Sequence, residues 1–100
     1  MNKRIKLPRI TEYSKTFVKA WKKVYDSGKA DMKLVKEVMI MIISNQGDLP
    51  EQYRDHELKG NFKGYRECHV KGDLLLVYYF VQEGKGVIFS DLGSHSEIFG

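Results

Sequence analysis

Residues 65–91 read YRECHVKGDLLLVYYFVQEGKGVIFSD, and this stretch decides the fold. Two groups of turn residues, Gly72-Asp73 and Glu83-Gly84-Lys85, divide it into three runs that are rich in aliphatic and aromatic residues. Short runs of this kind, separated by glycine-containing turns, are typical of antiparallel hairpins. The sequence therefore predicts three antiparallel strands, at about Tyr65–Lys71, Leu74–Gln82 and Gly86–Asp91, with the most apolar one at the centre.

Two helices are predicted before these strands. The first begins after Ser14, a good N-cap residue, and ends at Ser27-Gly28. The second runs from about Met32 to Ser44, with Asp31 as its N-cap and an apolar stripe wide enough for deep burial. The short connection between them indicates an antiparallel helical hairpin. The apolar residues of the first helix recur at helical spacing: Phe17, Ala20, Trp21, Val24 and Tyr25.

The remaining segments carry weaker signals. Arg4–Ile10 alternates roughly between polar and apolar residues and reads as a first strand, in which Pro8 favours a sheet edge or a strand end. Residues 51–63 are polar and irregular, and residues 93–100 form a short tail. The element order β-α-α-β-β-β predicts one α+β domain over residues 1–100, with a two-helix hairpin packed on one face of a small, mainly antiparallel sheet.

Composition limits the class of protein. With 42% hydrophobic and 30% charged residues, the chain should be globular. The formal net charge of +4 favours a polyanionic partner or an acidic protein partner. The one cysteine, Cys68, excludes an internal disulfide and fits a reducing cytoplasm. We expect no signal peptide and no membrane span, because the basic N-terminus lacks an apolar core and no run of ~18 apolar residues occurs.

Three histidines stand out in the second half of the chain: His56, His69 and His95. Strand alternation places Glu67 and His69 on one face of the sheet and Cys68 on the other, apolar face. His69 should therefore point to the face that the helices leave open. An imidazole changes charge near neutral pH, so it can take or give a proton in a transition state.

Cleavage of RNA by its own 2′-OH needs such groups. A base removes the 2′-OH proton, an acid protonates the leaving 5′-oxygen, and positive charge stabilises the non-bridging oxygens. We expect His95 to be the acid and Asp73 or His56 to act on the base side, with His69 in the same site. Phe99 is a candidate for stacking on a base, a contact worth roughly 1–3 kcal/mol. Four basic residues lie near the first two histidines in the sequence and are candidates for binding phosphate: Arg54, Lys59, Lys63 and Arg66.

Four blocks of the chain, in order and at family-like spacing, resemble the YafQ-type mRNA interferase toxins of the RelE/ParE superfamily. They are YRDHELKG at Tyr53–Gly60, GYRECHV at Gly64–Val70, DLLLVY at Asp73–Tyr78 and GSHSEIF at Gly93–Phe99. The resemblance is dense from Leu49 onward, while the first half of the chain matches only in its element order.

The resemblance implies the toxin of a type II toxin–antitoxin system. Such a toxin is a ribosome-dependent, cytoplasmic endoribonuclease without a metal or cofactor, and a cognate acidic antitoxin neutralises it. The family often has a basic residue where this chain has Asp91 and an aromatic residue where it has Leu74, so a phosphate contact and a stacking contact are left open. The family's active-site positions fall on these residues: His56, His69, Asp73, His95 and Phe99.

Three alternatives remain. A zinc site is the other chemical interpretation of three histidines, but the chain lacks the short His–His or Cys–Cys spacing of such sites. A non-enzymatic toxin that binds a protein target, as in the ParE branch, would not need the histidine set. A small basic nucleic-acid-binding module without catalytic chemistry would explain the charge but not the four blocks.

Overall fold

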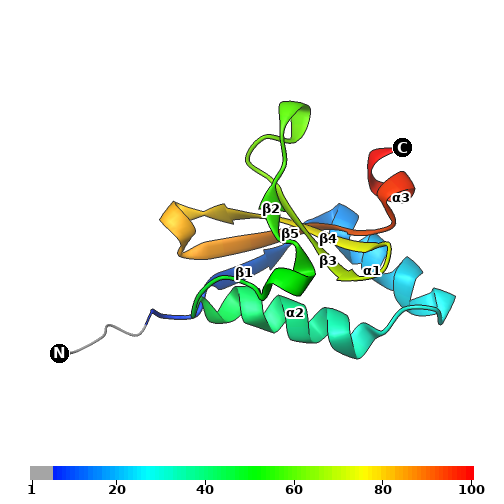
Figure 1. The fold of residues 1–100 in the computed structure, drawn as a ribbon, viewed down its shortest axis with the longest axis horizontal. Coiled ribbons are helices and arrows are strands. Elements are labelled where there is room, and N and C mark those ends of the chain that lie inside the picture. The colour runs from blue at the N-terminus through cyan, green and yellow to red at the C-terminus, as the bar shows by residue number, and fades with distance from the viewer. Residues whose placement is uncertain (1–5) are drawn as a thin grey trace.

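A computed structural model describes residues 6–100. Its five-stranded sheet has the order β1-β5-β4-β3-β2, and α1 and α2 pack beneath one face of it (Figure 1). The elements are β1 (Ile10–Tyr13), α1 (Lys15–Ser27), α2 (Met32–Ser44), η1 (Glu51–Tyr53), β2 (His56–Glu57), η2 (Gly60–Phe62), β3 (Arg66–Lys71), β4 (Leu74–Val81), η3 (Gln82–Gly84), β5 (Gly86–Gly93) and α3 (His95–Phe99). This arrangement confirms the predicted α+β class.

The three predicted strands form the antiparallel meander expected of them. β4 pairs with β3 on one side and with β5 on the other, so the most apolar strand is central. The ladder between β4 and β5 shifts register after Val77, which pairs with Asp91 while Tyr78 pairs with Phe89. This bulge leaves Ser90 unpaired in the ladder, where its carbonyl accepts a hydrogen bond from the Ser14 hydroxyl.

Both helices begin and end where local sequence predicts. The Ser14 side chain accepts a hydrogen bond from the Phe17 amide, and α1 ends at Gly28, whose φ of 67° is the left-handed conformation that glycine adopts without strain. The Asp31 carboxylate caps α2 by accepting from the Leu34 amide at 3.1 Å. Capping therefore sets the length of both helices.

The core lies between these helices and one face of the sheet. Phe17 of α1 packs against Phe89 of β5, with ring centroids 5.8 Å apart, and Val35 and Val38 of α2 are fully buried. Cys68 is also fully buried on this face, and burial raises the pKa of its thiol to about 12. The cysteine is thus a small core residue and not a nucleophile.

The predicted first strand is wrong in its position. Residues 4 and 5 lie outside the described residues, residues 6–9 form no strand, and β1 runs instead from Ile10 to Tyr13, parallel to β5. Arg9 explains the difference: its amide donates to the Ile43 carbonyl at 2.7 Å and its guanidinium donates to the carbonyls of Ile42 and Gly84. Two of these bonds tie Arg9 to the end of α2, and the third ties it to η3. The strand therefore begins after Arg9, at Ile10.

Besides η1 and η2, a strand and an α-helix appear where the sequence indicated irregular chain. The two-residue strand β2 extends the sheet at its edge, and the five-residue helix α3 follows β5 at the C-terminus. Figure 1 shows the loop between β2 and β3 and helix α3 rising on the side of the sheet opposite α2. The face of the sheet that the long helices leave open is therefore bordered by this loop and by α3. Within residues 6–100, no helix has the length and apolarity needed to cross a membrane.

Candidate active site

A row of side chains crosses the open face of the sheet. His56 of β2 pairs with Glu67 of β3, Glu67 pairs with Val77 of β4, and Val77 pairs with Asp91 of β5. Residues paired across strands point to the same face. Val77 is 3% exposed and forms an apolar floor between the polar groups. His69 pairs with Leu75 in the neighbouring row, so it lies on the same face, as strand alternation predicted.

Glu67 is placed between two of the predicted catalytic histidines. One of its carboxylate oxygens lies 3.3 Å from Nε2 of His56 and 3.7 Å from Nε2 of His69. The two imidazole centroids are 6.4 Å apart. Glu67 is 7% exposed and is the one charged residue in the described chain that is buried. A buried carboxylate needs polar or charged partners, and these two histidines supply them.

The second ring nitrogen of His56 is also engaged. Its Nδ1 lies 2.7 Å from the carbonyl oxygen of Arg54, which can only accept a hydrogen bond, so Nδ1 carries the proton. Nε2 is then the atom that gains or loses a proton, and it faces Glu67. This arrangement fixes the orientation of the ring and places a carboxylate beside Nε2.

A buried polar cluster on the opposite face holds the chain next to His56. Asp55 accepts hydrogen bonds from Arg66 at 2.9 Å and from the hydroxyl of Tyr78, which is 1% exposed. Arg54 and Arg66 also line a surface hollow on this side, with Asp48. The geometry therefore separates Arg66 from the histidines and gives its guanidinium a partner in Asp55. It does not favour Arg66 or Arg54 as phosphate contacts in the same site.

Aromatic contacts join α3 to the loop that precedes β3. The rings of His95 and Phe99 are 5.0 Å apart between centroids, and Phe99 meets the edge of Phe62 in η2 at 5.0 Å. Phe62 in turn contacts Tyr65, which packs on Tyr79 of the open face. The predicted His95 and Phe99 are thus brought to the rim of the open face. Phe62 was not predicted, since nothing in its local sequence marks it.

Asp73, the remaining predicted catalytic residue, lies in the tight turn between β3 and β4, as the sequence predicted. It is exposed and shares a hollow of about 610 Å³ with Ser94 and Glu97 at the start of α3, and with Lys23 of α1. Asp73 is therefore beside the C-terminal helix. Of the predicted catalytic residues, His56 and His69 lie close together, with Glu67 between them. His95 and Asp73 lie on different sides of α3.

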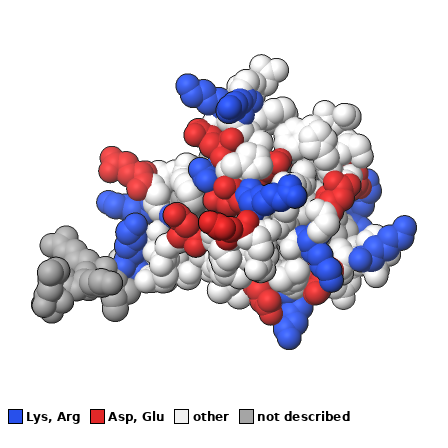
Figure 2. All heavy atoms as spheres, viewed as in Figure 1, with Lys and Arg blue, Asp and Glu red and all other residues white. Residues whose placement is uncertain are grey.

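The two predicted lysines flank η2 and are exposed. Lys59 precedes η2 and Lys63 follows it, so both lie on the loop that carries Phe62. Figure 2 shows basic and acidic side chains interspersed on the face that it presents. The net charge of the chain is therefore not gathered into one patch on that face.

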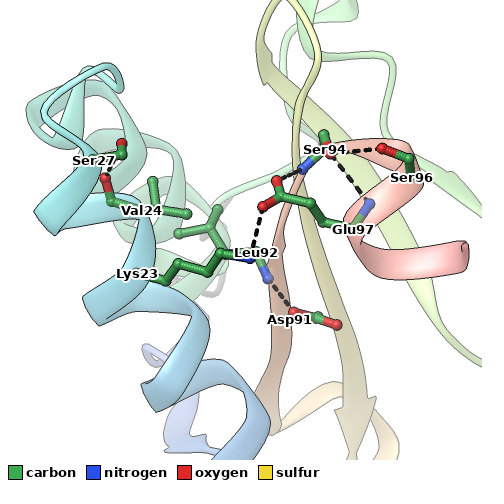
Figure 3. Close-up of polar contacts among 8 residues, drawn as sticks. All are labelled: Lys23, Val24, Ser27, Asp91, Leu92, Ser94, Ser96 and Glu97. Carbon is green, nitrogen blue, oxygen red and sulfur yellow. Dashed lines mark hydrogen bonds and ion pairs between the residues drawn. The ribbon is translucent and has the colours of Figure 1, made fainter.

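Helix α3 is attached by polar contacts, which Figure 3 shows. The Glu97 carboxylate accepts a hydrogen bond from the Ser94 amide at 2.8 Å, and it forms an ion pair with Lys23 of α1 at 3.2 Å. The Ser94 hydroxyl accepts in return from the Glu97 amide at 3.2 Å, which completes a capping box. The hydrogen bond from the Ser94 amide, with smaller contributions from the Ser94 hydroxyl and Lys23, lowers the pKa of Glu97 from its ordinary value.

Glu67 is the residue of this candidate site that the sequence interpretation did not assign. Its position two residues before His69 on a strand was a usable signal, because that spacing places both side chains on one face. The contact with His56 had no such signal, since it depends on β2 joining the sheet. Among residues 6–100, no three His, Cys, Asp or Glu side chains are grouped so as to hold a metal ion.

An apolar groove lies on the helix side of the molecule. It has a volume of about 420 Å³. Ile40 of α2 and Val18 of α1 are 62% and 57% exposed in it, which is unusual for large aliphatic side chains that lie so close together. The groove is lined by Tyr13, Phe17, Val18, Trp21, Lys36, Met39, Ile40 and Ile43.

Comparison with known proteins gives a consistent set of relatives. The model of a family described as the bacterial toxin of type II toxin–antitoxin systems, YafQ, matches residues 9–100. The mRNA interferase toxin YafQ of Escherichia coli strain K12 is 37% identical over 94 residues, which cover 94% of this chain and 99% of that protein. The match thus includes the helical half, where the sequence alone showed only a common element order.

Solved structures agree in fold. A chain from the crystal structure of the Escherichia coli DinJ-YafQ toxin-antitoxin complex superposes with a TM-score of 0.84 at 37% identity, over 94% of this chain and all (100%) of that one. A metal-bound toxin from Helicobacter pylori superposes with a TM-score of 0.77 at 40% identity, over 91% of this chain and 99% of that one.

Proposed function

The chain belongs to the YafQ family of bacterial type II toxins, and from this premise we propose that it is an mRNA interferase that cleaves mRNA on the translating ribosome. The observation that carries the proposal is the placement of Glu67 between His56 and His69 on the open face. A carboxylate that orients imidazoles is an arrangement suited to proton transfer. A toxin that only binds a target would have no need to bury a carboxylate between two histidines.

The reaction assigned to this site is transesterification by the RNA itself. The 2′-oxygen attacks the adjacent phosphorus as a base takes its proton, and the bond from phosphorus to the 5′-oxygen breaks as an acid protonates that oxygen. Nε2 of His56 can receive the proton, because the Arg54 carbonyl holds the other ring nitrogen as the donor. Glu67 then stabilises the resulting imidazolium, and Asp73 is the alternative base.

His95 is assigned the role of the acid, and His69 that of a second imidazole held by Glu67. His95 is exposed at the rim, where it can meet a leaving oxygen on a bound strand. Phe99 and Phe62 present aromatic rings beside it, and a base that stacks there would gain roughly 1–3 kcal/mol. Lys59 and Lys63 are the proposed phosphate contacts, because they project from the same loop as Phe62.

The site is proposed to work without a metal ion. Proton transfer by side chains and positive charge from imidazolium and lysine cover the needs of in-line attack by the 2′-OH. The products should be one fragment ending in a 2′,3′-cyclic phosphate or 3′-phosphate and one beginning with a 5′-OH. We expect toxin that has been treated with EDTA and then freed of it by gel filtration to cleave ribosome-bound mRNA at the untreated rate.

End-group analysis of the cleaved mRNA and the rate after EDTA treatment are the two measurements. Ribosomes are supplied in their own magnesium buffer, so that only a metal carried by the toxin is removed. The Helicobacter pylori relative has been solved in a metal-bound form, which makes a zinc-supplemented arm necessary. Loss of cleavage after EDTA that zinc restores would show that the proposed mechanism is wrong.

The partner proposed for this toxin is a cognate acidic antitoxin, since a relative is solved in a toxin–antitoxin complex. We propose that the C-terminal segment of the antitoxin docks on basic surface and on the open sheet face. We propose that apolar side chains of the antitoxin also fill the groove between α1 and α2. Lys36 lies in that groove and suits an acidic segment, and the exposed Val18 and Ile40 need an apolar cover.

Ile40→Glu should weaken the complex with the antitoxin at least tenfold while leaving ribonuclease activity unchanged. Ile40 is 62% exposed, so the change costs the fold little, but it places a charge in the proposed interface. Tyr25→Glu is the matched control, because Tyr25 is 64% exposed on α1 and does not line the groove. The measurement is titration calorimetry with the antitoxin. Equal affinities of the two variants would exclude the groove as a docking site.

A further inference from the structure

Helix α3 is too short and too exposed to be stable without contacts to the rest of the domain. It contains five residues, and none of its side chains is buried. An isolated helix shorter than about 12–15 residues is marginal in water, so contacts outside the helix must hold it. Its first residue is His95, which means that whatever holds α3 also places the proposed acid.

Glu97 makes most of the polar contacts that attach this helix. One carboxylate oxygen accepts from the Ser94 amide, and the other faces Nζ of Lys23. The carboxylate therefore joins the turn after β5 to helix α1, as Figure 3 shows. His95 lies between Ser94 and Glu97 in the chain, within the closed ring of the capping box.

The Glu97 side chain lies close to the backbone of Gly93, next to this ring. A Cβ atom built on Gly93 would lie 3.2 Å from the Glu97 carboxylate and 3.4 Å from its Cβ. Gly93 pairs with Leu75, which in turn pairs with His69. The side chain of Glu97 thus packs on the backbone of Gly93, at the end of the row that contains His69.

We propose that Glu97 is a positioning residue, which sets the place of His95 by closing the capping box. The inference rests on the proposed function for the role of His95, but not for the attachment of α3. The capping box should matter more than the ion pair. The side chains of Lys23 and Glu97 are 74% and 44% exposed, and exposed ion pairs contribute little.

Three substitutions separate these contributions. Glu97→Ala removes both the capping box and the ion pair. Glu97→Gln keeps an acceptor for the Ser94 amide, since glutamine also completes a capping box, but it removes the charge that faces Lys23. Lys23→Ala removes the ion pair alone, and Lys22→Ala is its matched control, because Lys22 pairs with Asp26 within α1.

The first readout does not depend on catalysis. The amides of Ile98 and Gly100 donate hydrogen bonds to the carbonyls of Ser94 and Ser96. Their rates of hydrogen exchange therefore report how often α3 unfolds locally. Exchange should rise roughly twofold to thirtyfold in Glu97→Ala, the factor that corresponds to the loss of a helix cap. It should stay near the wild-type rate in Glu97→Gln. NMR signals of the His95 ring, shifted by the Phe99 ring beside it, should move toward free-histidine values in Glu97→Ala only.

The second readout is cleavage of ribosome-bound mRNA. Glu97→Ala should lower kcat with little change in KM, because it misplaces an acid and does not remove a substrate contact. Glu97→Gln should restore most of the wild-type kcat, and Lys23→Ala should resemble Lys22→Ala. Unchanged exchange and unchanged His95 signals in Glu97→Ala would overturn the proposal. So would increased exchange with wild-type kcat, since the position of His95 would then not depend on Glu97.

The result also separates this inference from the proposed function. If wild-type toxin fails to cleave mRNA, the function is wrong, while hydrogen exchange and the His95 signals still decide whether Glu97 holds the helix. If wild type cleaves and Glu97→Gln fails to rescue Glu97→Ala, the function stands and the role given to the capping box falls.

Discussion

His95→Ala should reduce cleavage of ribosome-bound mRNA by ~10²–10⁴-fold, the contribution typical of a general acid. His95 is exposed at the start of α3 and outside the core, so the substitution should leave the folded structure intact. Binding to the antitoxin should also stay close to that of wild type. The measurement is the single-turnover cleavage rate, with thermal unfolding and antitoxin titration on the same samples.

Two companion variants sharpen this test. His95→Gln keeps a polar side chain of similar length but cannot transfer a proton at neutral pH, so it should be as impaired as His95→Ala. Ser96→Ala, at the next position of α3, should cleave at nearly the wild-type rate. If His95→Ala cleaves as fast as wild type, the proposed site is wrong, and a ParE-like toxin that binds and inhibits a protein target becomes the better interpretation.

His56→Ala should cost a similar factor, ~10²–10⁴, because it removes the imidazole whose protonation Glu67 and the Arg54 carbonyl prepare. Glu67→Gln should cost less, since the histidines remain and lose only the carboxylate that orients and stabilises them. His69→Ala should lie between these two or match the first. The decisive measurement is the single-turnover cleavage rate of each variant on ribosome-bound mRNA, with thermal unfolding on the same samples.

Glu57→Gln is the control for Glu67→Gln. It makes the same chemical change on the residue after His56, but Glu57 is exposed and forms no ion pair with a histidine among residues 6–100. A double variant, His56→Ala with Glu67→Gln, should lose little more than His56→Ala alone if the two residues act as a unit. Fully additive losses would mean that Glu67 does not work through His56.

The N-terminal strand shows the limits of reading local pattern. Arg4–Ile10 alternates as a strand should, but Leu7 and Ile10 are 82% and 67% exposed and cover no core. The observed strand lies further along because Arg9 bonds to carbonyls at the end of α2 and beyond β4. Alternation reports a possible face for burial, whereas the partner of a strand depends on distant residues.

The sequence by itself determined the elements whose causes are local. Caps at Ser14, Gly28 and Asp31 set the helices, turn residues set the meander, and the alternation in β3 placed His69 on the open face. These features depend on residues within a few positions of one another, so periodicity and capping rules suffice to predict them. The family blocks likewise marked the three histidines and Asp73.

Only the tertiary structure decided how these residues act together. Glu67 meets His56 because β2 joins the edge of the sheet, and on the other face Arg66 meets Asp55, which also accepts a hydrogen bond from Tyr78. Helix α3, which begins at His95, contacts α1 through the Glu97–Lys23 ion pair and the loop before β3 through Phe99 and Phe62. Each of these is a contact between segments far apart in the chain, and no local pattern encodes such a contact, because its free energy arises only when the whole sheet has formed.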